Sequence, residues 1–233
     1  MPTKTNLRID WATYEAAKYA CENWHYSGCM PAGKLVKFGV WENGKYVGVV
    51  IFGLGATPNL SKSYGLTMQQ CCELCRVALT KHTTAVTRII SIALKFLKKH
   101  CPGISLVVSF ADTEQGHHGG IYQGGGWIYS GSVRLDTWVI NGKKIHPRSV
   151  VMKYGTQKLD AILRIDPKAH KTWGIKHRYL MPLTDEIRQR ILPLSKSYPK
   201  RAGSKDNVAS GFQSEEGGVI PTPALQTSEV ISG

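Results

Sequence analysis

Side chains that could carry acid–base chemistry stand at three places in the chain. His25 and Tyr26 lie in the stretch "HYSG", Asp112 ends the apolar run "SLVVSFAD", and Tyr122 lies in the glycine-rich stretch "GHHGGIYQGGGWIYSG". The carboxylate of Asp112 or the imidazole of His25 could act as a general base, because an imidazole titrates close to neutral pH. The two tyrosines could stack on a ring or protonate a leaving group.

Asp112 and His25 each also have a structural alternative. Asp112 follows a predicted strand, so its side chain could cap the N-terminus of a helix. His25 could be a turn histidine that is bonded to the backbone. Together with His117 and His118, these two residues could also form a two-histidine-one-carboxylate metal site of the kind that holds non-haem iron. No closely spaced H-x-D pair supports that site.

The cysteine pattern favours free thiols over a metal site. Cys72 and Cys75 form a C-x-x-C pair, but a structural zinc site needs four ligands and the sequence has no second pair of this kind. We therefore expect the pair to pack in the core. The opening "MPTKTNLRIDWATYE" has no apolar segment and no run of about 18 apolar residues occurs, which predicts a cytoplasmic protein with reduced thiols.

Basic residues accumulate in the first 192 residues. The formal net charge is +14, and residues 1–192 carry 26 basic against 12 acidic side chains. A domain this basic attracts polyanions, so we expect a nucleic acid as partner. The alternative is a surface that is basic only for solubility. The side chains expected to hold phosphates are those of Lys143, Lys144, Arg148 and Lys153.

Periodicity and turn signals predict a mixed α/β fold, with a mostly antiparallel central sheet flanked by helices. Asn43-Gly44 and Asn141-Gly142 predict hairpin turns. We expect one catalytic domain over residues 5–192 and a disordered Ser-, Gly- and Pro-rich tail over residues 193–233. The expected elements are a helix over 10–25, strands over 34–42, 45–53 and 73–80, a long helix over 83–103, a strand over 105–112, a short helix, and strands over 127–140 and 177–183.

Tyr122, Gly126 and Trp127 resemble the end of the GCN5-related N-acetyltransferase fold. In that fold a tyrosine at this place often donates a proton to the departing thiolate of coenzyme A, and the glycine gives a sharp exit into the next strand. The fold also binds pyrophosphate on a glycine-containing loop before its long helix. Here the corresponding loop, "TKHTTAVTR", contains no glycine, which argues against coenzyme A.

A second resemblance covers residues 20–155. The segments "HYSG", "PAGK", "FGVWENGKYVGVVIFG", "ELCRVAL" and "LVVSFAD", followed by the glycine-rich stretch, look like those of the Mom family of phage DNA-modification proteins. This resemblance implies an acetyltransferase-like fold in the cytoplasm of a bacterial host. It also implies an enzyme that converts adenine in double-stranded DNA to a carbamoylmethyl derivative on the exocyclic amine, which protects phage DNA from restriction.

The same resemblance implies which residues act. The catalytic residues would be His25, Tyr26, Asp112 and Tyr122, and the residues that bind substrate or donor would be Glu73, Arg76, Ser109, His117 and Gln123. Arg76 could pair with Glu73 or meet a phosphate. Where relatives tend to have "IYQATN", this chain has "IYQGGG", so contacts made by those side chains are lost.

The product suggests a donor. A glycyl group placed on the adenine amine could rearrange to the carbamoylmethyl derivative, so glycyl-tRNA is one expected donor beside acetyl-coenzyme A, with iron a further alternative. Adenine in a duplex is paired, so the base is expected to be flipped out. Tyr26, Tyr122, Trp127 or Trp138 could then stack on it. Two other functions stay open: a coenzyme A-dependent N-acetyltransferase of a protein or small amine, and a basic DNA-binding protein without catalysis.

Overall fold

The computed structural model of the chain describes residues 5–55, 59–145 and 147–200. The strands are β1 (Leu7–Trp11), β2 (Leu35–Glu42), β3 (Lys45–Gly53), β4 (Cys71–Leu79), β5 (Leu106–Asp112), β6 (Ile128–Ile140), β7 (Lys143–Ile145) and β8 (His170–Pro182). The helices are α1 (Tyr14–Trp24), α2 (Val86–His100), α3 (Gly120–Gln123), α4 (Pro147–Tyr154), α5 (Leu159–Ile165) and α6 (Asp185–Ile191), with short 3-10 turns η1 (Lys62–Tyr64), η2 (Thr113–Gln115) and η3 (Leu192–Leu194).

The strands form one sheet in the order β1-β2-β3-β4-β5-β8-β6-β7. Among the described strands only β4 and β5 run parallel, and every other pairing is antiparallel. Helix α2 forms the crossover between these two strands, because parallel strands need a connection of a dozen or more residues. The expected mixed α/β class with a mostly antiparallel sheet is therefore confirmed.

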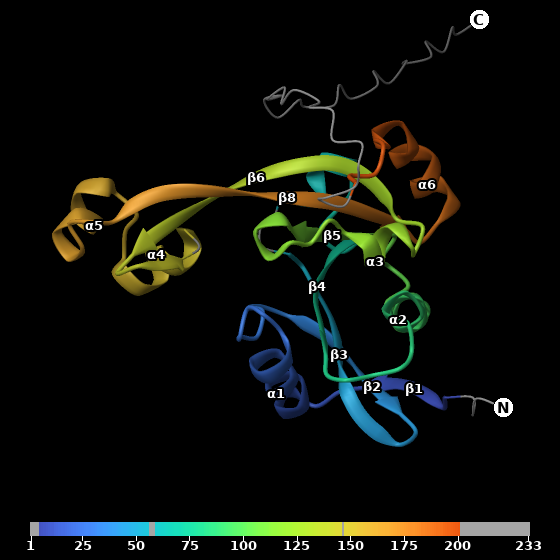
Figure 1. The fold of residues 1–233 in the computed structure, drawn as a ribbon. Coiled ribbons are helices and arrows are strands. Elements are labelled where there is room, and N and C mark those ends of the chain that lie inside the picture. The colour runs from blue at the N-terminus through green and yellow to red at the C-terminus, as the bar shows by residue number, and fades with distance from the viewer. Residues whose placement is uncertain (1–4, 56–58, 146, 201–233) are drawn as a thin grey trace, which may run out of the picture. The chain divides into compact units, whose positions relative to one another are not determined.

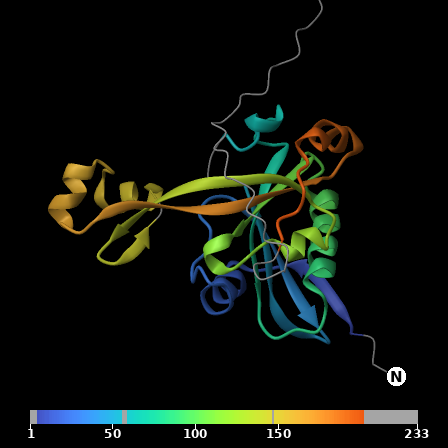
Figure 2. The ribbon, with the colours of Figure 1, turned by 45° about the horizontal axis from the view of Figure 1, so that its top comes forward.

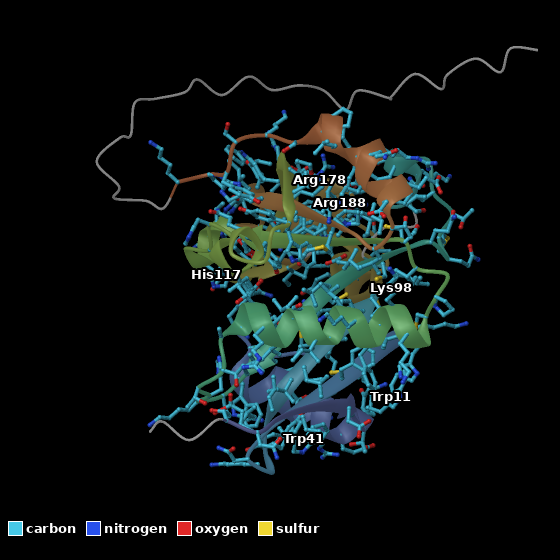
Figure 3. All side chains as sticks on the ribbon, turned by 90° about the vertical axis from the view of Figure 1, so that its right-hand side faces the viewer. Trp11, Trp41, Lys98, His117, Arg178 and Arg188 are labelled. Carbon is cyan, nitrogen blue, oxygen red and sulfur yellow. The ribbon has the colours of Figure 1, made fainter. Side chains whose placement is uncertain are left out.

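Helices cover both faces of the sheet (Figure 1). The apolar stripe of α2, which includes Ile89, Ile90 and Leu97, packs against one face together with α3. On the opposite face α1 packs on β3 and β4, and α6 packs on β8. Figure 3 shows Trp11 and Trp41 among the N-terminal strands on one side of α2, with His117 and Arg178 on the other.

One sequence prediction at the N-terminus is wrong. We expected Trp11 on the first helix, but it ends strand β1, and α1 begins only after Thr13. The Thr13 hydroxyl accepts a hydrogen bond from the Ala16 N–H at 3.2 Å and caps the helix, which begins at Tyr14, four residues later than expected. Trp11 fits both the helix periodicity that follows it and the short strand "LRIDW" that precedes it. Its pairing with Phe38 of β2 places it in the strand.

The distal parts of β6 and β8 extend beyond β5 and carry β7, α4 and α5 at their end (Figures 1 and 2). We call residues 133–175 the arm. The arm contains a small core of its own, in which Trp138, Ile140, Val150 and Ile162 are almost fully buried. Neither α4 nor α5 was expected from the sequence, because Pro147 and the short lengths of both helices weaken their periodicity.

We expect Trp138→Ala to unfold the arm while the rest of the sheet stays intact. Trp138 is 1% exposed at the centre of the arm's core, and removing a buried tryptophan costs about 3–5 kcal/mol. Hydrogen exchange would measure this as loss of amide protection over residues 143–169, with protection in α2 unchanged. Trp127→Ala is the control, since Trp127 belongs to the core under α2. Equal loss of protection in both regions would contradict an independent arm core.

Residues 195–200 lie against the domain. The Lys196 N–H donates to the Tyr129 carbonyl oxygen at 2.8 Å, and the Tyr198 hydroxyl donates to the Trp127 carbonyl oxygen at 2.7 Å. The remainder of the expected tail, from residue 201 onward, lies outside the described residues. Over the described part of the chain, no helix is both long and apolar enough to span a membrane.

Candidate active site

A cleft of about 1180 Å³ opens where β4 and β5 separate. The parallel pairing of these strands stops at Glu73 and Val108, although β4 continues to Leu79 and β5 to Asp112. Six of the predicted site residues line this cleft: His25, Tyr26, Glu73, Arg76, His117 and Tyr122. The structure therefore brings together residues from the turn after α1, from β4, and from the glycine-rich stretch.

The "HYSG" stretch is a tight turn that ends α1 and points His25 at the cleft. The Gly28 N–H donates to the His25 carbonyl oxygen at 2.9 Å, and Gly28 has a φ of 57°, a conformation that favours glycine. The Ser27 N–H donates to His25 Nδ1 at 3.1 Å, and Ser27 Oγ lies 2.8 Å from the same nitrogen. The structural alternative for His25, a turn histidine bonded to backbone, is thus observed.

His25 is held in its neutral form. Burial, the positive charge of Arg76 and the neighbouring His117 together lower the pKa of the imidazole to about 4, with burial the largest cause. Because Nδ1 accepts the Ser27 N–H, the ring proton lies on Nε2. An imidazole with Nδ1 engaged and a proton on Nε2 has no free lone pair, so His25 is a hydrogen-bond donor and a poor base.

Three aromatic rings form a continuous group at the cleft. The rings of His25 and Tyr26 lie 4.3 Å apart at an angle of 32°, and Tyr26 meets His117 edge-on at 5.6 Å. Tyr26 is 53% exposed although it contacts both histidines. Burial raises the pKa of its phenol, so Tyr26 stays protonated at neutral pH.

β4 contributes a cation and a carboxylate to the same cleft. Arg76 Nη1 donates to the Cys75 carbonyl oxygen at 2.7 Å, and Arg76 Nε is buried with no acceptor among the described residues. Glu73 is the one carboxylate among the described residues that line the cleft. Its charge contributes to raising the pKa of the Tyr122 phenol, which places it close to that ring.

Asp112 lies beside the cleft and does not line it. One carboxylate oxygen is 3.1 Å from Lys176 Nζ, and the other accepts the Glu114 N–H at 3.1 Å. The side chain is 13% exposed. Asp112 thus caps η2, as the structural alternative proposed, and it also positions Lys176, a cleft residue that sequence analysis missed.

Ser109 and Tyr122 close the bottom of the gap between β4 and β5. Ser109 Oγ lies 3.0 Å from the Leu74 carbonyl oxygen and 2.8 Å from the Tyr122 hydroxyl. The Tyr122 ring stacks on Tyr179 with centroids 5.0 Å apart, and burial raises the pKa of its phenol to about 12. Tyr122 therefore presents a protonated hydroxyl whose position is set by a buried serine.

Gln123 supports the glycine-rich stretch from outside the cleft. Its Nε2 donates to the His118 carbonyl oxygen, to the Tyr179 hydroxyl and to the Pro199 carbonyl oxygen at 3.0–3.2 Å. Gly119 is required in this turn, because its φ is 84° and a Cβ there would lie 2.3 Å from the Tyr179 ring. A direct role of Gln123 toward donor or substrate stays a prediction.

The arm brings the predicted phosphate-binding residues next to the cleft. Lys143 and Lys144 lie in β7, and Arg148 and Lys153 lie in α4, whose Met152 lines the cleft. Lys144 Nζ is 2.6 Å from Glu114 Oε1. Trp127 and Trp138 cannot stack on a flipped base as we expected, because each is only 1% exposed and belongs to a core.

A carboxylate of the chain lies at the loop before α2, which the resemblance to acetyltransferases identifies with the pyrophosphate-binding loop. Glu42 accepts hydrogen bonds from Thr83 N at 2.9 Å and Thr84 N at 2.6 Å, immediately before α2. Burial opposes this charge, but the four hydrogen bonds from Thr83 and Thr84 together hold the pKa of Glu42 at about 2. A pyrophosphate at the start of α2 would meet a buried negative charge and no free N–H groups at these positions. The residues present do not fit coenzyme A, and Glu42 was missed because its partners lie 41 and 42 residues away in sequence.

The described residues offer little to a metal ion. No three His, Cys, Asp or Glu side chains come together there in a way that could hold one, so the expected alternative of a two-histidine-one-carboxylate site has no geometric support. Burial raises the pKa of the Cys72 thiol well above its usual value and that of Cys75 to about 12. Both sulfurs stay protonated, which agrees with the expected packing role.

Comparisons with known proteins cover most of the chain. A model of the Mom protein family matches residues 6–200. The methylcarbamoylase Mom of Escherichia phage Mu is 26% identical over 195 residues, which are 79% of this chain and 79% of that protein. An N-acetyltransferase of Staphylococcus aureus Mu50 is similar in structure, with a TM-score of 0.41 and 15% identity over 77% of this chain and 99% of that chain.

Proposed function

Because the chain belongs to the Mom protein family, we propose that it is a transferase that converts adenine in double-stranded DNA to its N6-carbamoylmethyl derivative. The modification would protect phage DNA from restriction in the cytoplasm of the host. The observation that carries this proposal is the family match over residues 6–200, which includes every residue that lines the cleft. The curated relative is named a methylcarbamoylase of a phage.

We propose a glycyl ester of tRNA as the donor, because a glycyl group on the adenine amine can rearrange to the carbamoylmethyl derivative. The adenine amine attacks the glycyl carbonyl carbon, a C–N bond forms, and the ester C–O bond breaks. The amine loses one proton and the departing ribose oxygen gains one. The free amine of the attached glycyl group then attacks ring carbon C6, and the original nitrogen leaves that carbon as the carboxamide nitrogen. This second step is an isomerisation, so no further reactant is needed.

The chemistry of the cleft supports acyl transfer to a base. Its volume of about 1180 Å³ is large enough for a purine together with an acyl group. Tyr26, which is half exposed and lines the cleft, would stack on the extruded ring. Glu73 and Tyr122 both line the cleft. In this proposal Glu73 accepts the amine proton, and Tyr122, with its protonated hydroxyl, orients the acyl group.

The basic arm supports duplex DNA as the acceptor. Residues 133–175 carry nine Lys and Arg against three Asp. Asp136 pairs with Arg134, Asp160 pairs with Arg164, and Asp166 accepts two backbone N–H groups. Lys143, Lys153 and Lys158 form no ion pair with a described residue. A phosphate backbone laid along the arm would bring a flipped base to the adjoining cleft.

The test is a reconstituted reaction with purified protein, plasmid DNA and tRNA charged with isotope-labelled glycine. Nucleoside mass spectrometry should find adenosine with one carbamoylmethyl group that contains both labelled carbons. Acetyl-coenzyme A without tRNA should give no modified nucleoside. Acetylated adenosine or an acetylated protein in that second reaction would favour the N-acetyltransferase. Duplex binding with no product from either donor would favour a non-catalytic DNA-binding protein.

A further inference from the structure

We infer that His25 and Arg76 act as a pair of hydrogen-bond donors that stabilise the negative charge formed on the acyl oxygen during transfer. The inference rests on the proposed acyl transfer and gives His25 a role different from the general base expected from sequence. Three features of the cleft carry it: the tautomer of His25, the unused donors of Arg76, and the nearness of the two groups.

The first feature is the hydrogen bonding of His25. Nδ1 accepts the Ser27 N–H at 3.1 Å, and the Ser27 hydroxyl lies 2.8 Å from the same atom. The imidazole is neutral, so its single ring hydrogen is on Nε2. Among the described residues Nε2 has no acceptor, and it is not among the buried unpartnered atoms. The ring is fixed by its own turn and His25 lines the cleft, so we infer that this donor is directed into it.

The second feature is the guanidinium of Arg76. Nη1 is held by the Cys75 carbonyl oxygen at 2.7 Å, which anchors the plane of the group. Nε is buried and has no acceptor among the described residues. No hydrogen bond joins Nη2 to a described residue, and Arg76 lines the cleft, so Nη2 is the atom of the guanidinium to which we assign the second donor. Buried or anchored donors without acceptors are rare in folded proteins and often mark a binding function.

The third feature is that the two groups lie close together. The charge of Arg76 acts directly on the His25 imidazole, and both residues line the one cleft beside Tyr26 and Glu73. An acyl group bound in the cleft near Tyr122 would accept hydrogen bonds on its carbonyl oxygen from two N–H groups. One belongs to the turn after α1 and the other to strand β4. Two such donors, set before the reaction begins, are what an oxyanion requires.

The chemistry follows directly from this placement. When the adenine amine adds to the glycyl carbonyl carbon, the π electron pair of the C=O bond moves to oxygen. Both donors then contact a full negative charge where they previously contacted a neutral carbonyl. When the intermediate collapses, the electron pair returns and the ester oxygen leaves. Neither His25 nor Arg76 gives up its proton.

The experiment compares two substitutions at each position in the reconstituted reaction. His25→Gln keeps an N–H near the position of Nε2 and an oxygen that can accept the Ser27 N–H, whereas His25→Leu removes both. We expect His25→Leu to lower kcat by roughly 10²–10³-fold with little change in the KM for DNA. His25→Gln should stay within about tenfold of the wild type, which a histidine acting as a base would not allow.

Arg76→Met should lower kcat by a similar roughly 10²–10³-fold factor, and free guanidinium should restore part of it. The double variant His25→Leu/Arg76→Met should lose less than the product of the single losses, because both donors serve one oxygen. Thermal melting of every variant checks the fold. His25→Gln as inactive as His25→Leu, or Arg76→Met acting only on the KM for DNA, would overturn the inference. A wild type without product from glycyl-tRNA would instead refute the proposed function.

Discussion

Neutralising the four predicted phosphate-binding residues is expected to weaken duplex DNA binding by roughly 10²–10³-fold at low salt. The variant replaces Lys143, Lys144, Arg148 and Lys153 by Gln, all within β7 and α4 of the arm. Each lost phosphate contact should also lower the slope of log K against log salt by about 0.9. Fluorescence anisotropy of a labelled duplex over a salt series measures both quantities.

The matched control removes the same charge from another element. Arg88, Lys95, Lys98 and Lys99 are exposed residues of α2, and their replacement by Gln lowers the net charge equally. If the arm holds DNA, this control should keep most of the affinity and of the salt slope. Equal losses in the two variants would mean that overall charge attracts DNA without a defined surface. That result would remove the arm from the proposed function.

How much of the fold could be predicted depends on how local each signal is. The hairpin at Asn43-Gly44 is confirmed, with φ of 49° and 80°, because a type I′ turn depends on those two residues alone. Helix α2 is confirmed because its apolar stripe runs over four turns. The short helices α4 and α5 were missed, since their stability comes from Trp138 and Ile140 on a neighbouring strand.

The candidate site divides in the same way. The turn residues His25 and Tyr26 could be found because "HYSG" is a continuous stretch that carries part of the resemblance to the Mom family. Lys176 and Glu42 could not, since each gains its meaning from a partner far away in sequence, Asp112 in one case and the residues before α2 in the other. The tautomer of His25 depends on a single backbone N–H, which no residue pattern specifies.

Glu73→Gln is expected to lower the rate of adenine modification by roughly 10²–10⁴-fold, the usual contribution of a general base. The substitution keeps the size and polarity of the side chain but removes its ability to take a proton. Because Glu73 is the carboxylate that lines the described cleft, the KM for DNA should change little. Single-turnover kinetics with charged tRNA in excess would isolate the chemical step.

Asp112→Asn is the comparison that distinguishes the two carboxylates. Asparagine can still accept the Glu114 N–H and cap η2, so only the contact with Lys176 is lost. A partly exposed pair of this kind contributes little, and the rate should stay within about tenfold of the wild type. The pH–rate profile of Glu73→Gln should also lose its acid limb, that is, the fall in rate at low pH. The reason is that no carboxylate then has to ionise before the reaction. The opposite pattern, an inactive Asp112→Asn beside an active Glu73→Gln, would make Asp112 the base and Lys176 the residue that tunes it.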